Sequence, residues 1–264
     1  MKVIIPMAGA SRRFKEVGYE IPKPFLPIDG RPMIQWVCDM FDPEDEFIFV
    51  VREEHAQSQE YRTILQEAAP RSIIVPIPPH DQGPIVSTLA ADPHVDKDEP
   101  VLFSYCDFFQ RWNYPRYLQS VHGADGGIPV FYGFQPASFG TTYYAYLRCD
   151  EAGNMLELRE KEPFTSKREL EPASSGVYYV AAWDLFKKYA QGVLDRGESV
   201  GSEYYLSLIF NPMVEDDLRV TTFPIENFIC WGTPEDYRQY LFWSDYFAND
   251  AQRFFQEPSI QGHG

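Results

Sequence analysis

The chain has 264 residues and a formal net charge of −16, from 23 Lys and Arg against 39 Asp and Glu. Hydrophobic residues make up 44% of the composition and charged residues 23%, which is typical of a folded protein rather than a disordered one. The acidic balance argues against a nucleic-acid-binding protein and against docking on an anionic membrane. The length allows one large α/β domain or two small ones, at roughly 150 residues per domain.

Apolar runs such as Phe47 to Val51 fall well short of the roughly 20 residues that a membrane helix needs. The apolar N-terminal stretch is also too short for a signal peptide. The cysteines are scattered and contain no CxxC pair, so the sequence predicts neither a disulfide framework nor a zinc site. We therefore expect a cytoplasmic protein with reduced thiols, bound to neither nucleic acid nor membrane.

The first half of the chain alternates short apolar runs with amphipathic stretches. The runs predict strands at 2–7, 46–51, 72–76 and 100–105 and helices at 32–41, 54–68 and 85–91. Such alternation predicts a doubly wound α/β fold with a mostly parallel sheet. Ligands of these sheets bind at the carboxyl ends of the strands. The loops after Met7, Pro76 and Tyr105 are therefore where we expect the chemistry.

The pattern changes in the second half. Strands are predicted at 127–134, 143–149, 154–161 and 175–180, with a turn at Asp150 to Gly153, which indicates an antiparallel β excursion. Helices are predicted at 184–194, 203–210 and 234–247, the last with Thr233 as its N-cap, and the tail from about Asn249 is expected to fray. Because no linker or repeat interrupts the chain, we expect a single domain over residues 1–264.

The most informative stretch is the small-residue loop after the first strand, Pro6-Met7-Ala8-Gly9-Ala10-Ser11-Arg12-Arg13-Phe14, followed by Lys23-Pro24. Such a loop can present backbone N–H groups to a phosphate, which nearby Arg and Lys side chains neutralise. It is neither a P-loop nor a Rossmann fingerprint. The alternative is an ordinary strand-to-helix turn with solvated basic side chains.

This loop resembles the opening motif of the sugar-phosphate nucleotidylyltransferases, AGxGxRF followed by KP, with Ala8, Gly9, Arg13 and Phe14 matching. Further family landmarks follow in order along the chain: Asp81-Gln82-Gly83-Pro84, Leu102 to Asp107, Glu160-Lys161-Glu162-Pro163, Ser175-Gly176-Val177-Tyr178 and Trp231-Gly232-Thr233-Pro234-Glu235-Asp236. The combination is most similar to a capsule and surface-glycan branch that includes cytidylyltransferases acting on unusual phosphates such as phosphoglutamine. The resemblance covers about residues 1–240.

The resemblance implies transfer of a nucleoside monophosphate from an NTP, with CTP favoured, to a phosphorylated small molecule, with Mg²⁺ as cofactor and pyrophosphate as the leaving group. It implies a nucleotide-binding part at about 1–125 and an acceptor-binding part at about 126–230. The implied residues are, for catalysis, Arg13, Lys23 and Lys161; for the nucleotide, Ala8, Gly9, Ala10, Ser11, Gln82, Gly83 and Asp107; for the acceptor, Glu160, Lys161, Gly176 and Tyr178; and for the metal, Asp107.

The chain departs from the family pattern at three positions. Ser11 replaces the second glycine of the loop, and Ala145 replaces a glycine that contacts the sugar. Cys230 stands where the family has its second metal carboxylate, and a neutral thiol is a poor Mg²⁺ ligand. Asp107 then binds the metal with water and the triphosphate alone, or Glu226 substitutes, or the enzyme is weak or inactive.

Three of these positions also have an ordinary structural interpretation. Asp107 could be a helix N-cap, Gln82-Gly83 a plain loop, and Lys161 part of a solvated charge run. Competing functions are a nucleotide-sugar-dependent glycosyltransferase and a non-catalytic nucleotide-binding homologue. A glycosyltransferase would use a DxD motif, which Asp107-Phe108-Phe109 lacks. The aromatic C-terminal helix also leaves a homodimer open.

Overall fold

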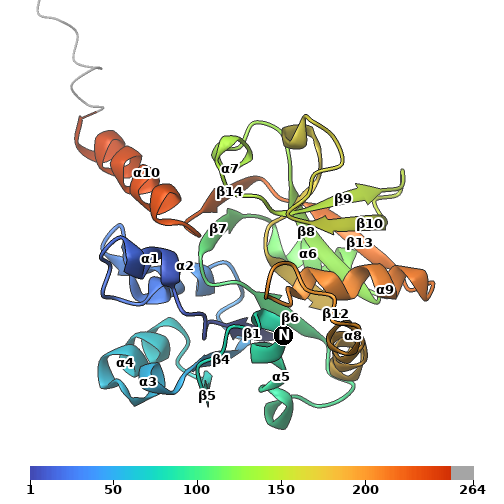
Figure 1. Cartoon of the computed structure of the whole chain (residues 1–264), viewed down its shortest axis with the longest axis horizontal. Coiled ribbons are helices and arrows are strands. Elements are labelled where there is room, and N and C mark those ends of the chain that lie inside the picture. The colour runs from blue at the N-terminus through green and yellow to red at the C-terminus, as the bar shows by residue number, and fades with distance from the viewer. Residues whose placement is uncertain (251–264) are drawn as a thin grey trace, which may run out of the picture.

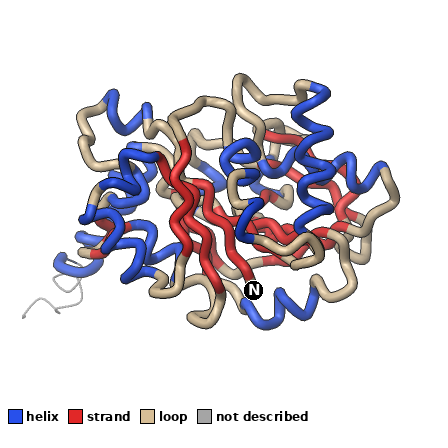
Figure 2. The backbone as a smooth tube through the Cα atoms, turned by 90° about the horizontal axis from the view of Figure 1, so that it is seen from below, coloured by secondary structure: helices blue, strands red, loops and turns tan. Residues whose placement is uncertain are grey.

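The computed structural model describes residues 1–250. The centre of the molecule is a mixed β-sheet, which Figures 1 and 2 show from two directions. One side of this sheet is parallel, in the order β6-β1-β4-β5. These strands are β1 (Lys2–Pro6), β4 (Glu46–Arg52), β5 (Ile73–Ile77) and β6 (Val101–Ser104). Since parallel strands place their carboxyl ends at one edge, the loops after β1, β5 and β6 open on the same side.

The other side of the sheet is largely antiparallel. It runs β12-β8-β11-β9-β10 outward from β6, and β13 joins β8 in parallel. The strands are β8 (Gly126–Phe131), β9 (Ala145–Cys149), β10 (Met155–Glu160), β11 (Ala173–Ser174), β12 (Val177–Val180) and β13 (Val220–Pro224). The predicted fold class, a parallel α/β sheet with an antiparallel excursion, is confirmed.

Two small ribbons accompany the main sheet, and both are antiparallel. Their strands are β2 (Pro27–Ile28) with β3 (Arg31–Pro32), and β7 (Phe108–Arg111) with β14 (Asn227–Cys230). The second ribbon pairs Cys230 with Phe108, and Trp231 N donates a hydrogen bond to Asp107 O at 2.8 Å. It therefore brings the C-terminal third of the chain to the end of β6.

The core lies on both faces of the sheet because successive strand residues point to opposite sides. On β1, Ile4 belongs to one cluster of buried side chains, whereas Val3 and Ile5 belong to the other. The first cluster also receives α5 (Pro84–Leu89), α8 (Trp183–Arg196) and α9 (Phe210–Glu215); the second receives α2 (Met33–Cys38), α4 (Gln59–Ala68) and α6 (Tyr114–Ser120). Figure 2 shows helices to either side of the central strands.

The remaining helical elements are short, apart from α10. They are α1 (Arg12–Glu16), α3 (Glu53–Gln57), α7 (Pro136–Phe139), α10 (Pro234–Asp245), the 3₁₀ turns η1 (Lys23–Phe25), η2 (Asp92–His94), η3 (Arg168–Leu170) and η4 (Leu206–Ile209), and the π-helical turn η5 (Tyr246–Asp250). Thr233 caps α10 as predicted, because its hydroxyl accepts a 3.1 Å hydrogen bond from Asp236 N. A third core cluster joins both ends of the chain: Phe14, Leu26, Ile28, Met33, Trp231 and Tyr237.

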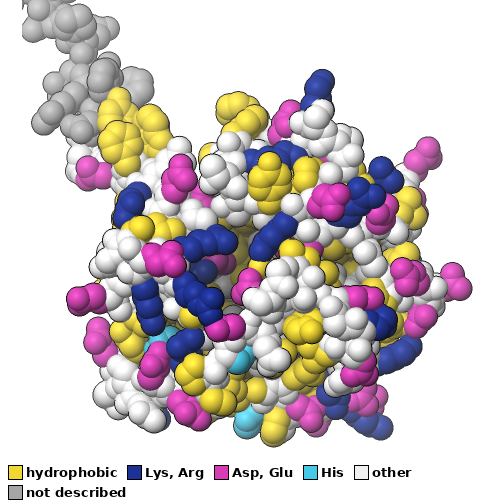
Figure 3. Space-filling model, viewed as in Figure 1, with side chains coloured by type: hydrophobic (Ala, Val, Ile, Leu, Met, Phe, Trp, Pro, Cys, Tyr) yellow, Lys and Arg dark blue, Asp and Glu magenta, His cyan; other side chains and the backbone are white. Residues whose placement is uncertain are grey.

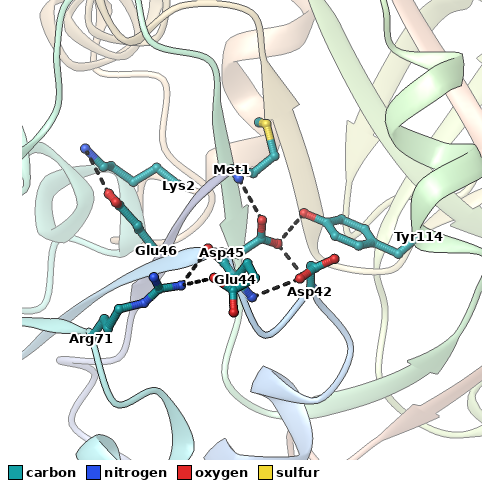
Figure 4. Close-up of polar contacts among 8 residues, drawn as sticks. All are labelled: Met1, Lys2, Asp42, Glu44, Asp45, Glu46, Arg71 and Tyr114. Carbon is teal, nitrogen blue, oxygen red and sulfur yellow. Dashed lines mark hydrogen bonds and ion pairs between the residues drawn. The ribbon is translucent and has the colours of Figure 1, made fainter.

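Asp45, at the start of β4, fixes the amino-terminal edge of the sheet (Figure 4). This carboxylate is buried, with 7% of the residue exposed. It accepts hydrogen bonds from the Met1 amino group at 2.7 Å, from the Tyr114 hydroxyl at 2.5 Å and from Asp42 N at 3.2 Å. Asp45 thereby ties β1 and α6 to β4.

The structure corrects three element predictions. The helix predicted at 54–68 is two helices, α3 and α4, because Ser58 is extended and its hydroxyl caps α4 by accepting from Tyr61 N at 3.4 Å. The strand predicted at 175–180 begins only at Val177, after Gly176 with φ +93°. The helix predicted at 203–210 is wrong at its start, since Tyr204 bonds through its backbone to another loop.

Other differences are omissions. The sequence analysis predicted no element at α1, α6, β7, β13 or β14, and α10 ends at Asp245 rather than at residue 247. The tail beyond residue 250 lies outside the described residues, so its predicted fraying is not addressed. Among the helices of the described part, none combines the length and apolar character needed to span a bilayer.

Candidate active site

A cavity of about 1030 Å³ opens at the carboxyl ends of the parallel strands. Its walls include residues from the loops after β1, β5 and β6, as predicted from the topology, and from the antiparallel part of the sheet. Basic side chains gather around a hollow in this face of the molecule (Figure 3). The cations on the cavity wall are Arg12, Arg13, Lys23 and Lys161. An acidic protein thus collects positive charge at one site.

The loop after β1 is held in place from both sides. Residues Ala8 to Arg13 all line the cavity. Arg52 Nε donates a 2.9 Å hydrogen bond to Ala8 O, and Lys23 N donates one of 3.3 Å to Ser11 Oγ. Ser11 adopts φ +52° at the start of α1, in the left-handed region where the family's glycine would be unstrained. The serine replaces that glycine and ties the loop to Lys23.

Lys23 and Asp107 form an ion pair at the cavity wall, with Nζ 2.6 Å from Oδ2. The side chains are 22% and 23% exposed, so the pair is only partly screened by solvent. Burial opposes the charge on Lys23, but Asp107 together with the nearby Cys106 and Cys230 outweighs burial, and the pKa of Lys23 lies above its ordinary value. Lys23 is consequently a permanent cation at neutral pH.

Cys230 and Gly232 lie directly beside this pair. A Cβ on Gly232 would be 3.2 Å from Asp107 Oδ2 and 3.3 Å from Cys230 Sγ, so only glycine leaves both groups their present space. Burial, with help from Asp107 and Asp236, raises the pKa of the Cys230 thiol to about 12. The thiol therefore stays protonated and is a poor ligand for Mg²⁺.

The two other carboxylates considered as metal ligands, Asp236 and Glu226, differ in where their side chains lie. The Asp236 side chain accepts hydrogen bonds from the hydroxyls of Thr233 at 2.7 Å and Thr142 at 2.9 Å. Glu226, the suggested substitute ligand, is exposed and is absent from the cavity wall. The structure thus does not bring Glu226 to the site, and Asp107 remains the carboxylate beside Lys23.

Mg²⁺ fits this donor set through one protein ligand. Among the described residues, no group of three or more His, Cys, Asp or Glu side chains is placed to hold a metal ion. Mg²⁺ commonly binds through one or two carboxylates and takes its other ligands from phosphate oxygens and water. Asp107, which faces the cavity, meets that requirement together with a bound triphosphate.

The loop after β5 is closely packed. Gly83 lines the cavity with φ +91°, and a Cβ there would lie 2.7 Å from Tyr204 N. Gln82 is exposed and is not part of the cavity wall, although its backbone accepts a 2.8 Å hydrogen bond from Tyr204 N. Asp81 of the same loop forms an ion pair with Arg12, which connects the loops after β1 and β5.

The four predicted acceptor residues also meet at the cavity. Glu160 is held by the Ser207 hydroxyl at 2.5 Å, and burial raises the pKa of its carboxyl. Lys161 follows the end of β10 with φ +60°, a left-handed conformation that is strained for a lysine. A Cβ on Gly176 would lie 2.9 Å from the Tyr105 ring. Tyr178 is 2% exposed and packs mainly into the core.

Sequence reasoning gave Tyr205 no specific role, and it did not single out His80. Both line the cavity. His80 bonds Ser87 Oγ at 2.9 Å, and burial lowers the pKa of its imidazole. Tyr205 accepts a hydrogen bond from Lys161 and donates one to Glu203. Nothing in the sequence placed Tyr205 at the site, because residues 203–210 were predicted to form one helix.

A parallel sheet whose strand ends hold a small-residue loop, a cluster of cations and a carboxylate defines a nucleotide-binding α/β protein. The sequence matches the MobA-like NTP transferase domain over residues 3–174, and the chain belongs to that family. It is therefore a nucleotidyltransferase, as the resemblance implied. No curated protein sequence matches the chain.

Solved structures share the fold over nearly the whole chain. A nucleoside-diphosphate-sugar pyrophosphorylase from Vibrio cholerae RC9 is 20% identical and has a TM-score of 0.75, over 91% of this chain and 99% of its own. An inositol-1-phosphate CTP transferase from T. maritima is 17% identical with a TM-score of 0.68, over 92% and 94%. HddC from Yersinia pseudotuberculosis is 19% identical with a TM-score of 0.63, over 92% and 99%.

Proposed function

We propose that the protein transfers CMP from CTP to a phosphorylated small molecule, such as a sugar phosphate or phosphoglutamine, and releases pyrophosphate. The observation that carries the proposal is the Lys23–Asp107 pair beside the Ala8–Arg13 loop, in the same cavity as Lys161. Cations for a triphosphate and a separate cation for a second phosphate are what this reaction requires.

In the reaction, an oxygen of the acceptor phosphate attacks the α-phosphorus of the triphosphate. A new P–O bond forms, the bond between the α-phosphorus and the bridging oxygen to the β-phosphate breaks, and pyrophosphate leaves with the electron pair. The nucleophile is already anionic, so no general base is needed. Catalysis then consists of positioning and charge neutralisation.

Three of the four cations on the cavity wall have a part in this scheme. Arg13 holds the triphosphate with its planar guanidinium, and the backbone of Ala8 to Ser11 surrounds the phosphates. Lys23 stabilises the charge that develops at the α-phosphate, and Lys161 holds the acceptor phosphate. Asp107 would hold Mg²⁺, which supplies further neutralisation of phosphate charge when bound.

The preference for CTP rests on two supports. The first is the resemblance of Asp81 to Pro84, Tyr105 to Phe109 and Cys230 to Tyr237 to the capsule branch. The second is the shared fold with the T. maritima CTP transferase. We further propose a role in capsule or surface-glycan synthesis, in the cytoplasm, where four free thiols suit a reducing compartment. Residues 1–264 would form one catalytic domain, with the nucleotide at 1–125 and the acceptor at 126–230.

The test is pyrophosphate release with CTP, UTP, dTTP, ATP and GTP, each with Mg²⁺ and a panel of phosphorylated acceptors. Release that depends on CTP and on one acceptor supports the proposal. Binding of CTP without turnover of any acceptor would favour the non-catalytic homologue. Absence of triphosphate binding combined with turnover of a nucleotide-sugar would favour the glycosyltransferase.

A further inference from the structure

The segment Glu203 to Tyr205 lies between the nucleotide loop and the acceptor lysine. On the nucleotide side, Tyr204 N donates a 2.8 Å hydrogen bond to Gln82 O, and Ile85 N donates one of 3.0 Å to Tyr204 O. Gly83 sits between these bonds, and its missing Cβ allows the two backbones to approach. The position of the 82–85 loop therefore fixes the backbone at Tyr204.

On the acceptor side, the next residue reaches Lys161. The Lys161 ammonium group donates a hydrogen bond to the Tyr205 hydroxyl, which donates in turn to Glu203. Lys161 Nζ also lies 4.1 Å from the centroid of the Tyr205 ring, within cation–π range. A lysine ammonium can only donate, so the phenol oxygen must accept from it, and this leaves the phenol proton for Glu203.

We propose that Tyr205 is the positioning residue for Lys161, and that the 203–205 segment couples the nucleotide loop to the acceptor phosphate site. The inference rests on the proposed function, in which Lys161 binds that phosphate. A free lysine side chain loses rotamer entropy when it is fixed. Because Tyr205 holds the ammonium group before the acceptor arrives, part of that cost falls on folding rather than on binding.

The coupling is reciprocal by thermodynamic necessity. A nucleotide that fixes Gly83, which lines the cavity, also fixes the adjoining Tyr204 backbone and, through Tyr205, the Lys161 side chain. An acceptor phosphate on Lys161 strengthens nucleotide binding by the same factor.

The probes for this inference are CMP and CDP, whose affinities are measured by calorimetry on the full chain. CMP fills the nucleotide side alone. In the product of the proposed reaction the acceptor phosphate has become the second phosphate on the nucleotide, and CDP carries a phosphate at that place. The second phosphate of CDP could also bind at Arg13, so the affinities are measured in an Arg13→Ala background. There the ratio of CDP to CMP affinity reports the acceptor phosphate site, and a general loss of stability does not change this ratio.

Lys161→Ala should lower this ratio roughly 10- to 100-fold and Tyr205→Phe roughly 3- to 10-fold, with CMP affinity unchanged in both. The double variant should be no worse than Lys161→Ala, because the two side chains act in series. Tyr132→Phe, an exposed tyrosine outside the cavity wall, is the matched control. Thermal unfolding of each variant confirms that it is folded.

The outcomes separate the two proposals. If Lys161→Ala lowers the ratio and Tyr205→Phe does not, Tyr205 has no positioning role and the proposed function stands. If Lys161→Ala leaves the ratio unchanged, Lys161 is not the acceptor cation, and the inference fails together with that part of the proposed function.

A second pair of variants tests the coupling itself. Gly83→Ala displaces the 203–205 backbone, so it should lower both CMP affinity and the CDP to CMP ratio. Gly133→Ala is the matched control, since Gly133 also has a positive φ of +78° but no heavy atom within 4 Å of its Cβ position. Equal losses of CMP and CDP affinity in Gly83→Ala, with the ratio intact, would overturn the coupling.

Discussion

In the proposed reaction Lys23 has two partners in turn, Asp107 and the triphosphate. In the protein alone its ammonium group is paired with Asp107 at 2.6 Å. A triphosphate in the cavity presents several negative charges, and Mg²⁺ on Asp107 would free the lysine for them. Since the pKa of Lys23 is raised by Asp107, its charge does not titrate between pH 6 and about 9.

Lys23→Ala should reduce turnover at least about 100-fold, the loss typical of removing a group that stabilises transition-state charge. Steady-state pyrophosphate release measures the effect. Lys97→Ala is the control, because Lys97 is exposed, lies outside the cavity wall and has only a 3.9 Å ion pair with Asp98. If the Lys23 variant keeps more than a tenth of the original rate, Lys23 does not have the proposed catalytic role.

The cysteines give a prediction about pH. Burial raises the pKa of all four thiols above the ordinary value, for Cys106 and Cys230 to about 12. At pH 8 the thiolate fraction of Cys230 is on the order of 10⁻⁴, so iodoacetamide should label Cys230 of the folded protein very slowly. Mass spectrometry should show four labels after unfolding in guanidinium. Rapid labelling of Cys230 in the folded protein at pH 8 would contradict the raised pKa of this thiol.

The same shifts set the sign of the alkaline stability profile. An acid whose pKa rises on folding keeps its proton in the folded state while the unfolded state loses its own. The contribution of these thiols to stability is therefore constant below about pH 9 and falls as the pH rises from there toward 12.

At the scale of elements, the loops after β1 and β5 are linked through Arg12 and Asp81. Both side chains line the cavity, and more than half of each is exposed, so the pair contributes little to stability. In the proposed reaction the position of the pair matters, because Asp81 adds a negative charge to the cavity wall and pairs with Arg12, a cation on the same wall.

Asp81→Asn should accordingly strengthen triphosphate binding, by roughly two- to fivefold at low ionic strength, with the gain shrinking as salt is added. Calorimetric titration with CTP and Mg²⁺ at two salt concentrations tests this. Asp98→Asn is the control for a lost surface charge, because Asp98 lies outside the cavity wall. Weaker CTP binding in the Asp81 variant would mean that the carboxylate assists the nucleotide.

Elements were predictable from the sequence where their signal is local. The parallel strands are continuous apolar runs, such as Val3-Ile4-Ile5, and the hairpin of β9 and β10 is marked by the Asp150 to Gly153 turn. The strands β7 and β14 were not predicted because each is short and pairs with a partner more than 100 residues away. The extended start of 203–210 was not predicted because its hydrogen-bond partner is the backbone of Gln82 and Ile85.

The predicted site depended on topology and resemblance together. The strand-end rule located the loops, and the motifs supplied most of the residues that the cavity brings together. The contacts between side chains could not be derived in this way. The Tyr205–Lys161 bond and the Arg12–Asp81 pair each join segments from different strands, and their geometry depends on how those strands are packed.

At the scale of the whole molecule, Asp45 connects three segments at the edge of the sheet opposite the cavity loops (Figure 4). Asp45→Ala would leave the buried Tyr114 hydroxyl without its partner, at a cost of roughly 1–3 kcal/mol. Urea unfolding should show a lower midpoint with an unchanged slope. Glu44→Ala, an exposed neighbour, is the control. An unchanged midpoint in the Asp45 variant would mean that the Asp45 hydrogen bonds do not stabilise the fold.

The cluster that joins Phe14, Leu26, Ile28 and Met33 to Trp231 and Tyr237 has a consequence for synthesis. Phe14 leaves the ribosome more than 200 residues before its packing partners Trp231 and Tyr237. A nascent chain must therefore hold Phe14 without its final neighbours until residue 237 has emerged, and long-range contacts of this kind slow folding. Because Cys230 and Gly232 belong to the same late segment, the cavity wall is complete only after that segment has been synthesised.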